Sequence, residues 1–186
     1  MRMPMVIAGV CFAALTSQLM AVDAPASAPG YSVGLVQPAK LAETTIAYET
    51  VHATMEECGE PIAKAFPELY AKLQAAHIAP KGSPIVIFKS LQNKGGTPVD
   101  IDVAVPLPAN TVAPEGFQVR VLPSIPSVTA IIRGPFSSLK DAYLQFFSEL
   151  AMTGKVPQGE LRQRTLYYEG PNSPNNIVLV EMQTAE

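Results

Sequence analysis

The chain carries one structural pattern twice, and this internal repeat restricts the folds available to it. The segment AFPELYAKLQAAHIAPKG (65–82) aligns with AYLQFFSELAMTGKVPQG (142–159) when residue 65 is set against residue 142. In both copies apolar residues recur at i, i+3, i+4 and i+7, which predicts a helix with one apolar face. A Pro-x-Gly sequence then ends each helix. The matched positions are Ala65/Ala142, Phe66/Tyr143, Leu69/Phe146, Tyr70/Phe147, Leu73/Leu150, Pro80/Pro157 and Gly82/Gly159.

Strand-like runs surround each predicted helix in the same order. One run precedes each helix, TTIAYETVHAT in the first copy and SVTAIIRGP in the second. Two runs follow it: SPIVIFKS and VDIDVAVPL in the first copy, RQRTLYYEG and NIVLVEMQ in the second. In the runs that follow the helices, a second copy longer by two residues would match Phe88 with Tyr167 and Asp102 with Glu181.

The repeat predicts an α+β fold made of two strand-helix-strand-strand units with pseudo-two-fold symmetry. We expect the helices to pack on an antiparallel sheet, with a ligand groove between the halves, over the sheet. The halves would span about 41–108 and 116–184, and residues 116–122 would add a further strand. Phe88, Asp102, Tyr167 and Glu181 would face the groove.

The N-terminal residues differ from the rest. Arg2 precedes an apolar run from Met5 to Leu15, and small residues follow around Ala21. This layout predicts a secretory signal peptide over 1–21, and therefore a periplasmic or secreted protein. The Ala, Pro, Ser and Gly of residues 22–40 predict a flexible leader before a domain at 41–186. An N-terminal membrane anchor and a buried segment are the alternatives.

Composition argues against nucleic acid as a partner. Charged residues make up 16% of the chain, its formal net charge is −3, and it has no run of Lys or Arg. Binding to phosphates needs clustered cations. The hydrophobic fraction of 48% is enough for a packed core.

The sequence predicts neither a metal nor a cofactor. His52 and His77 stand apart, without cysteines or acids at ligand spacing. The sequence also contains no Gly-x-Ser-x-Gly turn and no phosphate-binding glycine loop. If Cys11 is removed with the signal peptide, Cys58 is left as a lone thiol, which we expect to be buried.

Several segments together resemble the GyrI-like small-molecule-binding domain, the effector-binding module of some multidrug-responsive and AraC-type regulators, which also occurs as a stand-alone protein. The resemblance covers residues 40 to 184. Its most specific parts are RGPF before an Ala-Tyr helix, a tyrosine strand followed by Gly-Pro-x-x-Pro, and a final strand with an acidic residue, VLVEMQ.

This resemblance implies a duplicated strand-helix-strand-strand fold, in agreement with the repeat. It also implies that Glu181 lies in a pocket for hydrophobic or cationic ligands, next to the tyrosine strand that holds Tyr167. The candidate ligand-binding residues are Glu181, Tyr167, Tyr168, Phe88, Asp102 and Tyr143. Some stand-alone relatives are hydrolases of cyclopropane-containing compounds that use a Tyr and a Glu, which makes Glu181 and Tyr167 or Tyr168 the catalytic candidates.

The chain departs from the family pattern at two places. The final strand lacks the usual apolar-Pro-apolar ending, because Met182, Gln183 and Thr184 follow Glu181. The segment HATMEECG is longer and more acidic than the His-x-Gly often found there. Because an apparent export signal stands where regulators carry a helix-turn-helix, we expect binding or catalysis outside the cytoplasm rather than regulation of transcription.

Three functions remain open at the level of sequence. The first is an exported protein that binds a small hydrophobic or cationic molecule, with Glu181 and the Tyr167/Tyr168 pair as polar anchors. The second is a small hydrolase in which Glu181 is the acid or base and a tyrosine orients the reacting group. The third is a protein-interaction module. Strand alternation alone is also consistent with Leu179, Glu181 and Gln183 facing solvent.

Overall fold

The computed structural model describes residues 30–89, 96–111 and 116–185. These residues form two helices, a short 3₁₀ turn and nine strands. The helices are α1 (Gly59–Ala75) and α2 (Leu139–Met152), and the 3₁₀ turn is Phe136–Ser138. The strands are β1 (Ser32–Val33), β2 (Gln37–Leu41), β3 (Thr44–Ala53), β4 (Ile85–Phe88), β5 (Val99–Pro106), β6 (Gln118–Leu122), β7 (Ile125–Arg133), β8 (Pro157–Tyr167) and β9 (Ile177–Thr184).

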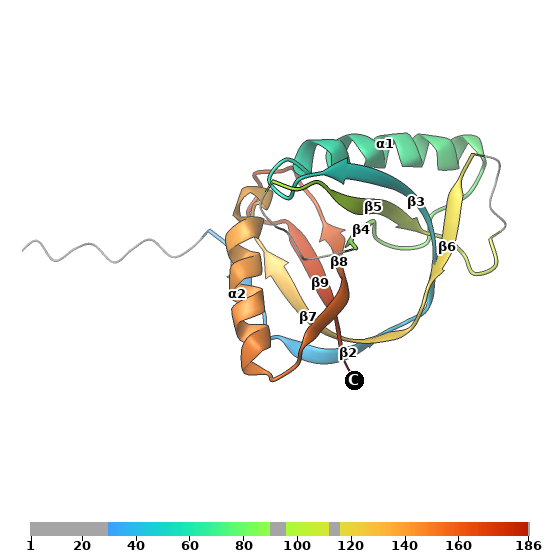
Figure 1. The fold of residues 1–186 in the computed structure, drawn as a ribbon. Coiled ribbons are helices and arrows are strands. Elements are labelled where there is room, and N and C mark those ends of the chain that lie inside the picture. The colour runs from blue at the N-terminus through green and yellow to red at the C-terminus, as the bar shows by residue number, and fades with distance from the viewer. Residues whose placement is uncertain (1–29, 90–95, 112–115, 186) are drawn as a thin grey trace, which may run out of the picture.

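All strands belong to one antiparallel sheet that curls and closes on itself (Figure 1). The strand order is β1-β7-β9-β8-β4-β5-β3-β6, and β2 also pairs with β7. Each of the pairs β2–β3 and β6–β7 forms one long bent ribbon, and the two ribbons pair with each other in a continuous register on both sides of their bends. Leu41 lies opposite Ile125, and Thr44 lies opposite Leu122. The sheet is therefore a small barrel, which has an inner face and a helix face.

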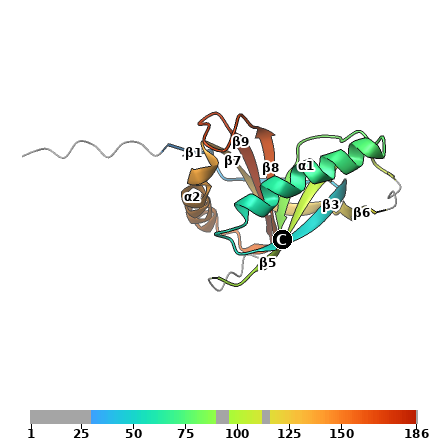
Figure 2. The same ribbon diagram turned by 90° about the horizontal axis from the view of Figure 1, so that it is seen from above.

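Both helices lie outside the curled sheet, where they cover its outer surface (Figures 1 and 2). Each presents one buried stripe to the strands, as the helical period predicted. In α1 the stripe is Ala65, Leu69 and Leu73, and in α2 it is Ala142, Phe146 and Leu150. These are the positions that the repeat matched, so the repeat identified the packing surface of each helix.

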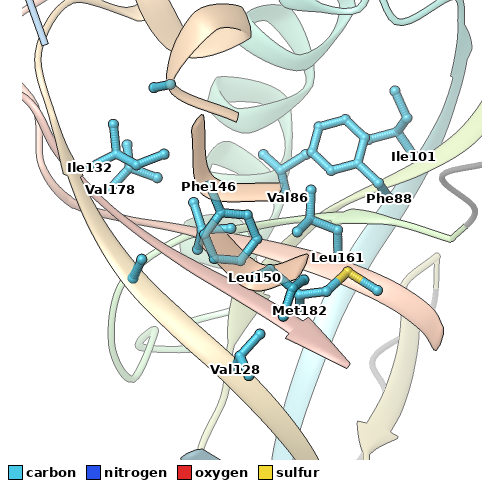
Figure 3. Close-up of a cluster of buried hydrophobic side chains, with 13 residues drawn as sticks. Val86, Phe88, Ile101, Val128, Ile132, Phe146, Leu150, Leu161, Val178 and Met182 are labelled. Atoms are coloured by element: carbon cyan, nitrogen blue, oxygen red, sulfur yellow. The ribbon is translucent and has the colours of Figure 1, made fainter. Parts of the chain in front are cut away.

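The largest apolar cluster lies between α2 and the helix face of the strands (Figure 3). Phe146 and Leu150 are fully buried there, against Val86, Leu161 and Met182. A second cluster fills part of the inner face and contains Ile46, Ile85, Ile87, Ala104 and Leu122. The sheet is thus packed on both faces, and polar groups on the inner face lie in a largely buried environment.

The predicted fold class is confirmed: two strand-helix-strand-strand units form an α+β structure in which helices pack on an antiparallel sheet. The additional strand predicted at 116–122 is β6. Strand β8 begins at Pro157, earlier than expected, so the Pro-x-Gly sequence at 157–159 lies within the strand and not in a turn before it.

The N-terminal side of the domain extends further than predicted. Residues 32–33 and 37–41 are strands β1 and β2, paired with β7, so this part of the expected leader is ordered and the domain begins before residue 41. Backbone pairing overrides the Pro- and Ala-rich composition, and Pro38 is tolerated because β2 pairs only with β7. The predicted signal peptide lies outside the described residues. Among the described residues, no helix is long and apolar enough to cross a membrane.

Candidate functional site

A row of side chains crosses the inner face of the sheet and joins the two halves. The strand registers place its members directly opposite one another, and residues so paired point to the same face. In the second half Glu181 lies between Thr129 and Arg162, and in the first half Asp102 lies between Thr50 and Ile87. Ile87 and Arg162 are themselves partners, which completes the row. The structure therefore confirms that Asp102 and Glu181 occupy equivalent positions.

Each of these two carboxylates is buried and carries an internal cation. Arg164 Nε donates to Glu181 Oε1 at 2.9 Å. Lys89 Nζ lies 2.8 Å from Asp102 Oδ1. The two cations are also equivalent, since Lys89 follows Ile87 by two residues and Arg164 follows Arg162 by two. A buried carboxylate requires such a partner, because the charge would otherwise be left without solvation.

A wider ionic network connects the first carboxylate to the second half. Arg120 Nη2 lies 2.9 Å from Asp102 Oδ2, and its guanidinium carbon lies 5.1 Å from the centre of the Tyr48 ring. Arg120 Nη2 is also 3.5 Å from Glu160 Oε1, and Arg162 Nη2 is 3.1 Å from Glu160 Oε2. The Thr50 hydroxyl donates to Asp102 Oδ1 at 2.6 Å. Glu160 thus bridges Arg120 and Arg162.

Four buried side-chain atoms of the described residues have no hydrogen-bond partner, and they belong to this network or to the pair of Glu181 and Arg164. They are Asp102 Oδ2, Arg120 Nε, Arg162 Nη1 and Glu181 Oε2. Asp102 Oδ2 still lies within ion-pair distance of Arg120, although the geometry is not that of a hydrogen bond. Unpartnered polar atoms in an interior are uncommon, and each needs a partner that the protein itself does not supply, such as water, an ion or a bound molecule.

The row leads outward to an opening that we call the barrel mouth, defined by two further rows of the inner face. The outermost row holds Arg133, Ile177 and Tyr167. The next row holds Ile131, Leu179 and Arg164, and the row of Glu181 follows. The exposed fraction falls along this path, from 48% for Tyr167 and 40% for Ile131 to 3% for Glu181 and 1% for Arg162.

An open depression of about 450 Å³ lies at the barrel mouth. Its lining combines the outermost row with the loop after β8: Arg133, Tyr167, Glu169, Pro174, Asn175 and Ile177. A second depression lies in the first half, where α1 meets β3 and β6. Its lining includes Leu69, Lys72 and Tyr48 and none of the predicted ligand residues. The barrel mouth is therefore the candidate site, because it joins an apolar entrance to buried charges.

Tyr167 belongs to the same face as Glu181 because of a β-bulge. The register of β8 against β9 shifts between Thr165 and Tyr167, so Tyr167 lies opposite Ile177. Glu181 comes four positions after Ile177 on β9, so the backbone positions of Tyr167 and Glu181 are roughly 13 Å apart along the strand direction. The Tyr167 hydroxyl donates instead to Glu169 Oε1 at 2.6 Å.

Glu169 organises the loop beside the barrel mouth. Ser173 Oγ and Asn175 Nδ2 each donate to its Oε2 at 2.8 Å. The hydrogen bond from Tyr167, followed by those from Asn175 and Ser173, lowers the pKa of Glu169 below its ordinary value. The same hydrogen bond and the charge of Glu169 raise the pKa of Tyr167. The pair therefore holds one carboxylate and one protonated phenol at neutral pH.

The other three predicted residues are not on the inner face. Phe88 is buried in the α2 cluster on the helix face. Tyr143, on α2, donates to Gln163 Oε1, and burial, followed by the nearby Cys58, raises the pKa of its hydroxyl. Tyr168 follows the end of β8, and its ring contacts Phe136 with centroids 5.4 Å apart.

The six predicted residues therefore do not line one groove between the helices. Asp102, Tyr167 and Glu181 face the inside of the barrel, while Phe88 and Tyr143 pack on the helix face. The match of Phe88 with Tyr167 is wrong, because Asp102 lies opposite Ile87 and Glu181 lies opposite Arg162, which makes Phe88 equivalent to Gln163. Relative to the first half, β8 is four residues out of step with the alignment that we drew, and only the sheet register shows this.

Sequence reasoning missed the cations of the inner face: Arg164 at the barrel mouth, and Lys89, Arg120 and Arg162 further inside. Arg162 and Arg164 alternate within a strand-like run, which places both on one face. This alternation could have signalled an interior ionic row, but a solvent-facing strand edge gives the same pattern. Only the register shows that these arginines lie beside Glu181 and Glu160.

The remaining chemistry-bearing groups form no site in the described part of the chain. No group of three His, Cys, Asp or Glu side chains there could hold a metal ion. Cys58 is a free thiol, half-buried before α1, and burial raises its pKa. His52 Nδ1 lies 2.6 Å from Asp100 Oδ1 in an exposed pair.

No family model and no curated protein sequence matches the chain, but solved structures do. The C-terminal domain of EcmrR has 13% sequence identity and a TM-score of 0.64, covering 84% of this chain and 98% of that domain. The longer EcmrR chain in a complex with DNA also matches, with 13% identity and a TM-score of 0.68. That match covers 83% of this chain and 57% of the EcmrR chain, so this chain spans little more than half of that protein's length.

Two further structures share the fold. SAV2435, solved with bound tetraphenylphosphonium, has 17% identity and a TM-score of 0.51, with 81% of this chain and 93% of that chain covered. A hydrolase from Listeria innocua has 9% identity and a TM-score of 0.52, with coverage of 82% and 93%. At these identities the likeness establishes the fold alone, and it agrees with the expected α+β architecture.

Proposed function

We propose that the protein binds a small, largely apolar molecule at the barrel mouth. The observation that carries this proposal is the gradient along the inner face, from exposed Tyr167 and Ile131 to the buried Glu181–Arg164 ion pair. Apolar side chains at an entrance favour a hydrophobic body, and polar groups at its end fix the orientation. Binding of tetraphenylphosphonium by SAV2435, a protein of the same fold, supports the proposal.

Thermal melting against a panel of compounds tests this function. The panel contains neutral hydrophobes, hydrophobic carboxylates and lipophilic cations including tetraphenylphosphonium. A ligand present at 100 times its Kd adds about 2.7 kcal/mol to the free energy of unfolding. We expect a rise in melting temperature with at least one class. Absence of any rise across the panel would contradict the proposal.

A pair of variants locates the binding. Ile131 is 40% exposed at the barrel mouth, and Leu144 is 65% exposed on α2. Ile131→Asp places a charge in the apolar entrance and should abolish the ligand-induced rise. Leu144→Asp makes the same kind of change away from the site and should preserve it. Equal loss in both variants would place the ligand elsewhere or reveal a non-specific effect.

Hydrolysis is the second candidate, favoured by one contact. Tyr167 and Glu169 are hydrogen-bonded at the depression, whereas Tyr167 and Glu181 are separated along the strand. A hydrolase would therefore use the Tyr167–Glu169 pair rather than the predicted pair with Glu181. Turnover of cyclopropane-containing compounds, followed by product analysis, should be lost in Tyr167→Phe and Glu169→Gln. Equal turnover in these variants would rule out this chemistry.

We also propose that the protein is exported, on the basis of the apolar run from Met5 to Leu15 and the small residues after it. Fractionation of cells that express the full chain should recover a shortened protein in the periplasm or the medium. A full-length protein in the cytoplasm would contradict export without affecting the binding proposal.

A further inference from the structure

Arg164 occupies the position from which a bound cation would reach Glu181. It lies one row nearer to the barrel mouth than Glu181, and its Nε already donates to Glu181 Oε1 at 2.9 Å. A positively charged group entering from the mouth would meet the guanidinium before the carboxylate. It would have to share one carboxylate with Arg164, at a depth where charges are poorly screened.

Each of the two rows of the barrel mouth contributes one guanidinium, Arg133 at the rim and Arg164 in the second row, and the row of Glu181 behind them contributes Arg162. Glu160 neutralises Arg162, and Glu181 neutralises Arg164. These ion pairs together contain four cations, Lys89, Arg120, Arg162 and Arg164, and three carboxylates, Asp102, Glu160 and Glu181, and no ion pair of the described residues joins Arg164 and Glu181 to the other five. The one positive charge in excess therefore lies in the group around Asp102 and Glu160, whereas at the mouth the carboxylate of Glu169 lines the depression together with Arg133. The preference for an anion consequently depends on the free donors of Arg164 and not on net charge.

The hydrogen-bonding capacity of the guanidinium groups supports this preference. Among the described residues, Arg164 makes its hydrogen bond through Nε, and no hydrogen bond of its two Nη atoms is present. Arg162 is 1% exposed, and its Nη1 has no partner. A guanidinium with unused donors in a fixed fork favours a planar oxyanion. The unpartnered acceptor, Glu181 Oε2, is buried beneath Arg164 and is less accessible from the mouth.

We infer that the barrel mouth selects a small molecule that carries a carboxylate on an apolar body, and that Arg164 determines this preference. The inference rests on the proposed binding function and names the ligand class for the same site. The apolar body would contact Ile131, Ile177 and Tyr167, and the carboxylate would accept hydrogen bonds from the free Nη atoms of Arg164. Lipophilic cations are disfavoured here, in contrast to the expectation from sequence.

Three probes with one body and different head groups test the inference: 4-phenylbutanoate, 4-phenylbutan-1-ol and 4-phenylbutylammonium. Their Kd values for the full chain are measured by calorimetric titration at pH 7.5 and low ionic strength. We expect the carboxylate to bind at least tenfold more tightly than the ammonium, with the alcohol between them. In Arg164→Gln the carboxylate should lose at least tenfold, and the ammonium should gain affinity because Glu181 loses its internal partner.

The repeat supplies a matched control. Lys89→Gln removes one positive charge at the equivalent position of the other half, beside Asp102. It should change the three Kd values less than threefold, which separates a contact at Arg164 from the general field of the network. Arg164→Lys keeps the charge and should retain the preference for the carboxylate. If Arg164→Gln fails to fold, the double variant Arg164→Gln/Glu181→Gln removes both charges and should abolish discrimination between the probes.

The outcomes separate the inference from the function on which it rests. Tighter binding of the ammonium than of the carboxylate would overturn the inference and leave the binding function standing. So would failure of all three probes together with a cationic hit in the melting panel. Failure of the probes and of the whole panel would overturn the binding function, and the inference with it. Equal effects of Arg164→Gln and Lys89→Gln would remove the role assigned to Arg164.

Discussion

The two halves of the molecule share one interior arrangement but differ at its ends. Each half places a threonine, a carboxylate and a cation on neighbouring strands: Thr50, Asp102 and Lys89 in the first, Thr129, Glu181 and Arg164 in the second. An ion pair at the same place in both halves indicates that the duplicated unit itself includes it. Buried pairs of this kind restrict the register of a sheet more than they stabilise it.

The difference lies in what surrounds each pair. Next to Asp102 the neighbouring strand contributes Ile87, whereas next to Glu181 it contributes Arg162. Further along, the first half ends in the exposed pair of His52 and Asp100, and the second ends in Ile131 and Leu179. The second half therefore combines apolar residues near its entrance, Ile131 and Leu179, with an interior row that contains one more arginine. Symmetry supplies the scaffold, and its loss at a few positions produces one candidate site instead of two.

The largest expected effect compares the helices. Phe146 in α2 and Leu69 in α1 are equivalent, and both are fully buried. Phe146→Ala should lower the free energy of unfolding by about 3–5 kcal/mol, and Leu69→Ala by about 2–5 kcal/mol, because each leaves a cavity. Urea unfolding measures both. Leu144→Ala, at an exposed position of α2, should change the stability by less than about 0.5 kcal/mol. A small effect of Phe146→Ala would show that α2 is not part of the cooperative core.

The next effect compares the two internal cations. Glu181 has one ionic partner, Arg164, whereas Asp102 has two, Lys89 and Arg120, and also accepts a hydrogen bond from Thr50. Arg164→Ala leaves a buried carboxylate uncompensated and should cost about 3 kcal/mol of unfolding free energy, at the low end for a broken buried pair. Lys89→Ala leaves Asp102 with two partners and should cost about 1 kcal/mol or less. Similar costs in urea unfolding would mean that the two pairs are equally buried in solution.

The fold was predictable from sequence because its signals are local and periodic. The spacing of Leu69 and Leu73, and of Phe146 and Leu150, identified both helices and their buried stripes. Alternation likewise predicted that Glu181 points to one face of the sheet and that Val180 and Met182 point to the other, where they join the α2 cluster. These patterns depend only on the number of residues per helical turn or per strand repeat, so a single sequence is enough to reveal them.

The site was less predictable because it depends on which strands pair and in which register. The ion pair between Arg164 and Glu181 requires the alignment of β8 with β9, and the place of Tyr167 requires a bulge in β8. A bulge inserts one residue and moves every later side chain to the other face. The alignment of Phe88 with Tyr167 failed because β8 is four residues out of step with the first half, and the bulge in addition turns Tyr167 to the inner face. The alignment of Asp102 with Glu181 held because β5 and β9 contain no such shift.

The smallest expected effect concerns the loop that distinguishes the second half. Hydrogen bonds, first from Tyr167 and then from Asn175 and Ser173, lower the pKa of Glu169 in the folded state. A folded-state pKa below the unfolded one stabilises the protein above the unfolded value, near 4.5, and this contribution is lost as the pH falls through the folded value. Glu169→Gln should therefore reduce the free energy of unfolding at pH 7 and have less effect at pH 3. Because Glu169 is exposed, the difference should be small and should shrink in high salt.

Chemical unfolding of both proteins from pH 7 to pH 3 measures it. A difference that stays constant over this range would show that the loop is held by the geometry of Ser173 and Asn175 rather than by the charge of Glu169, and the comparison of the two halves would then rest on the interior ion pairs alone.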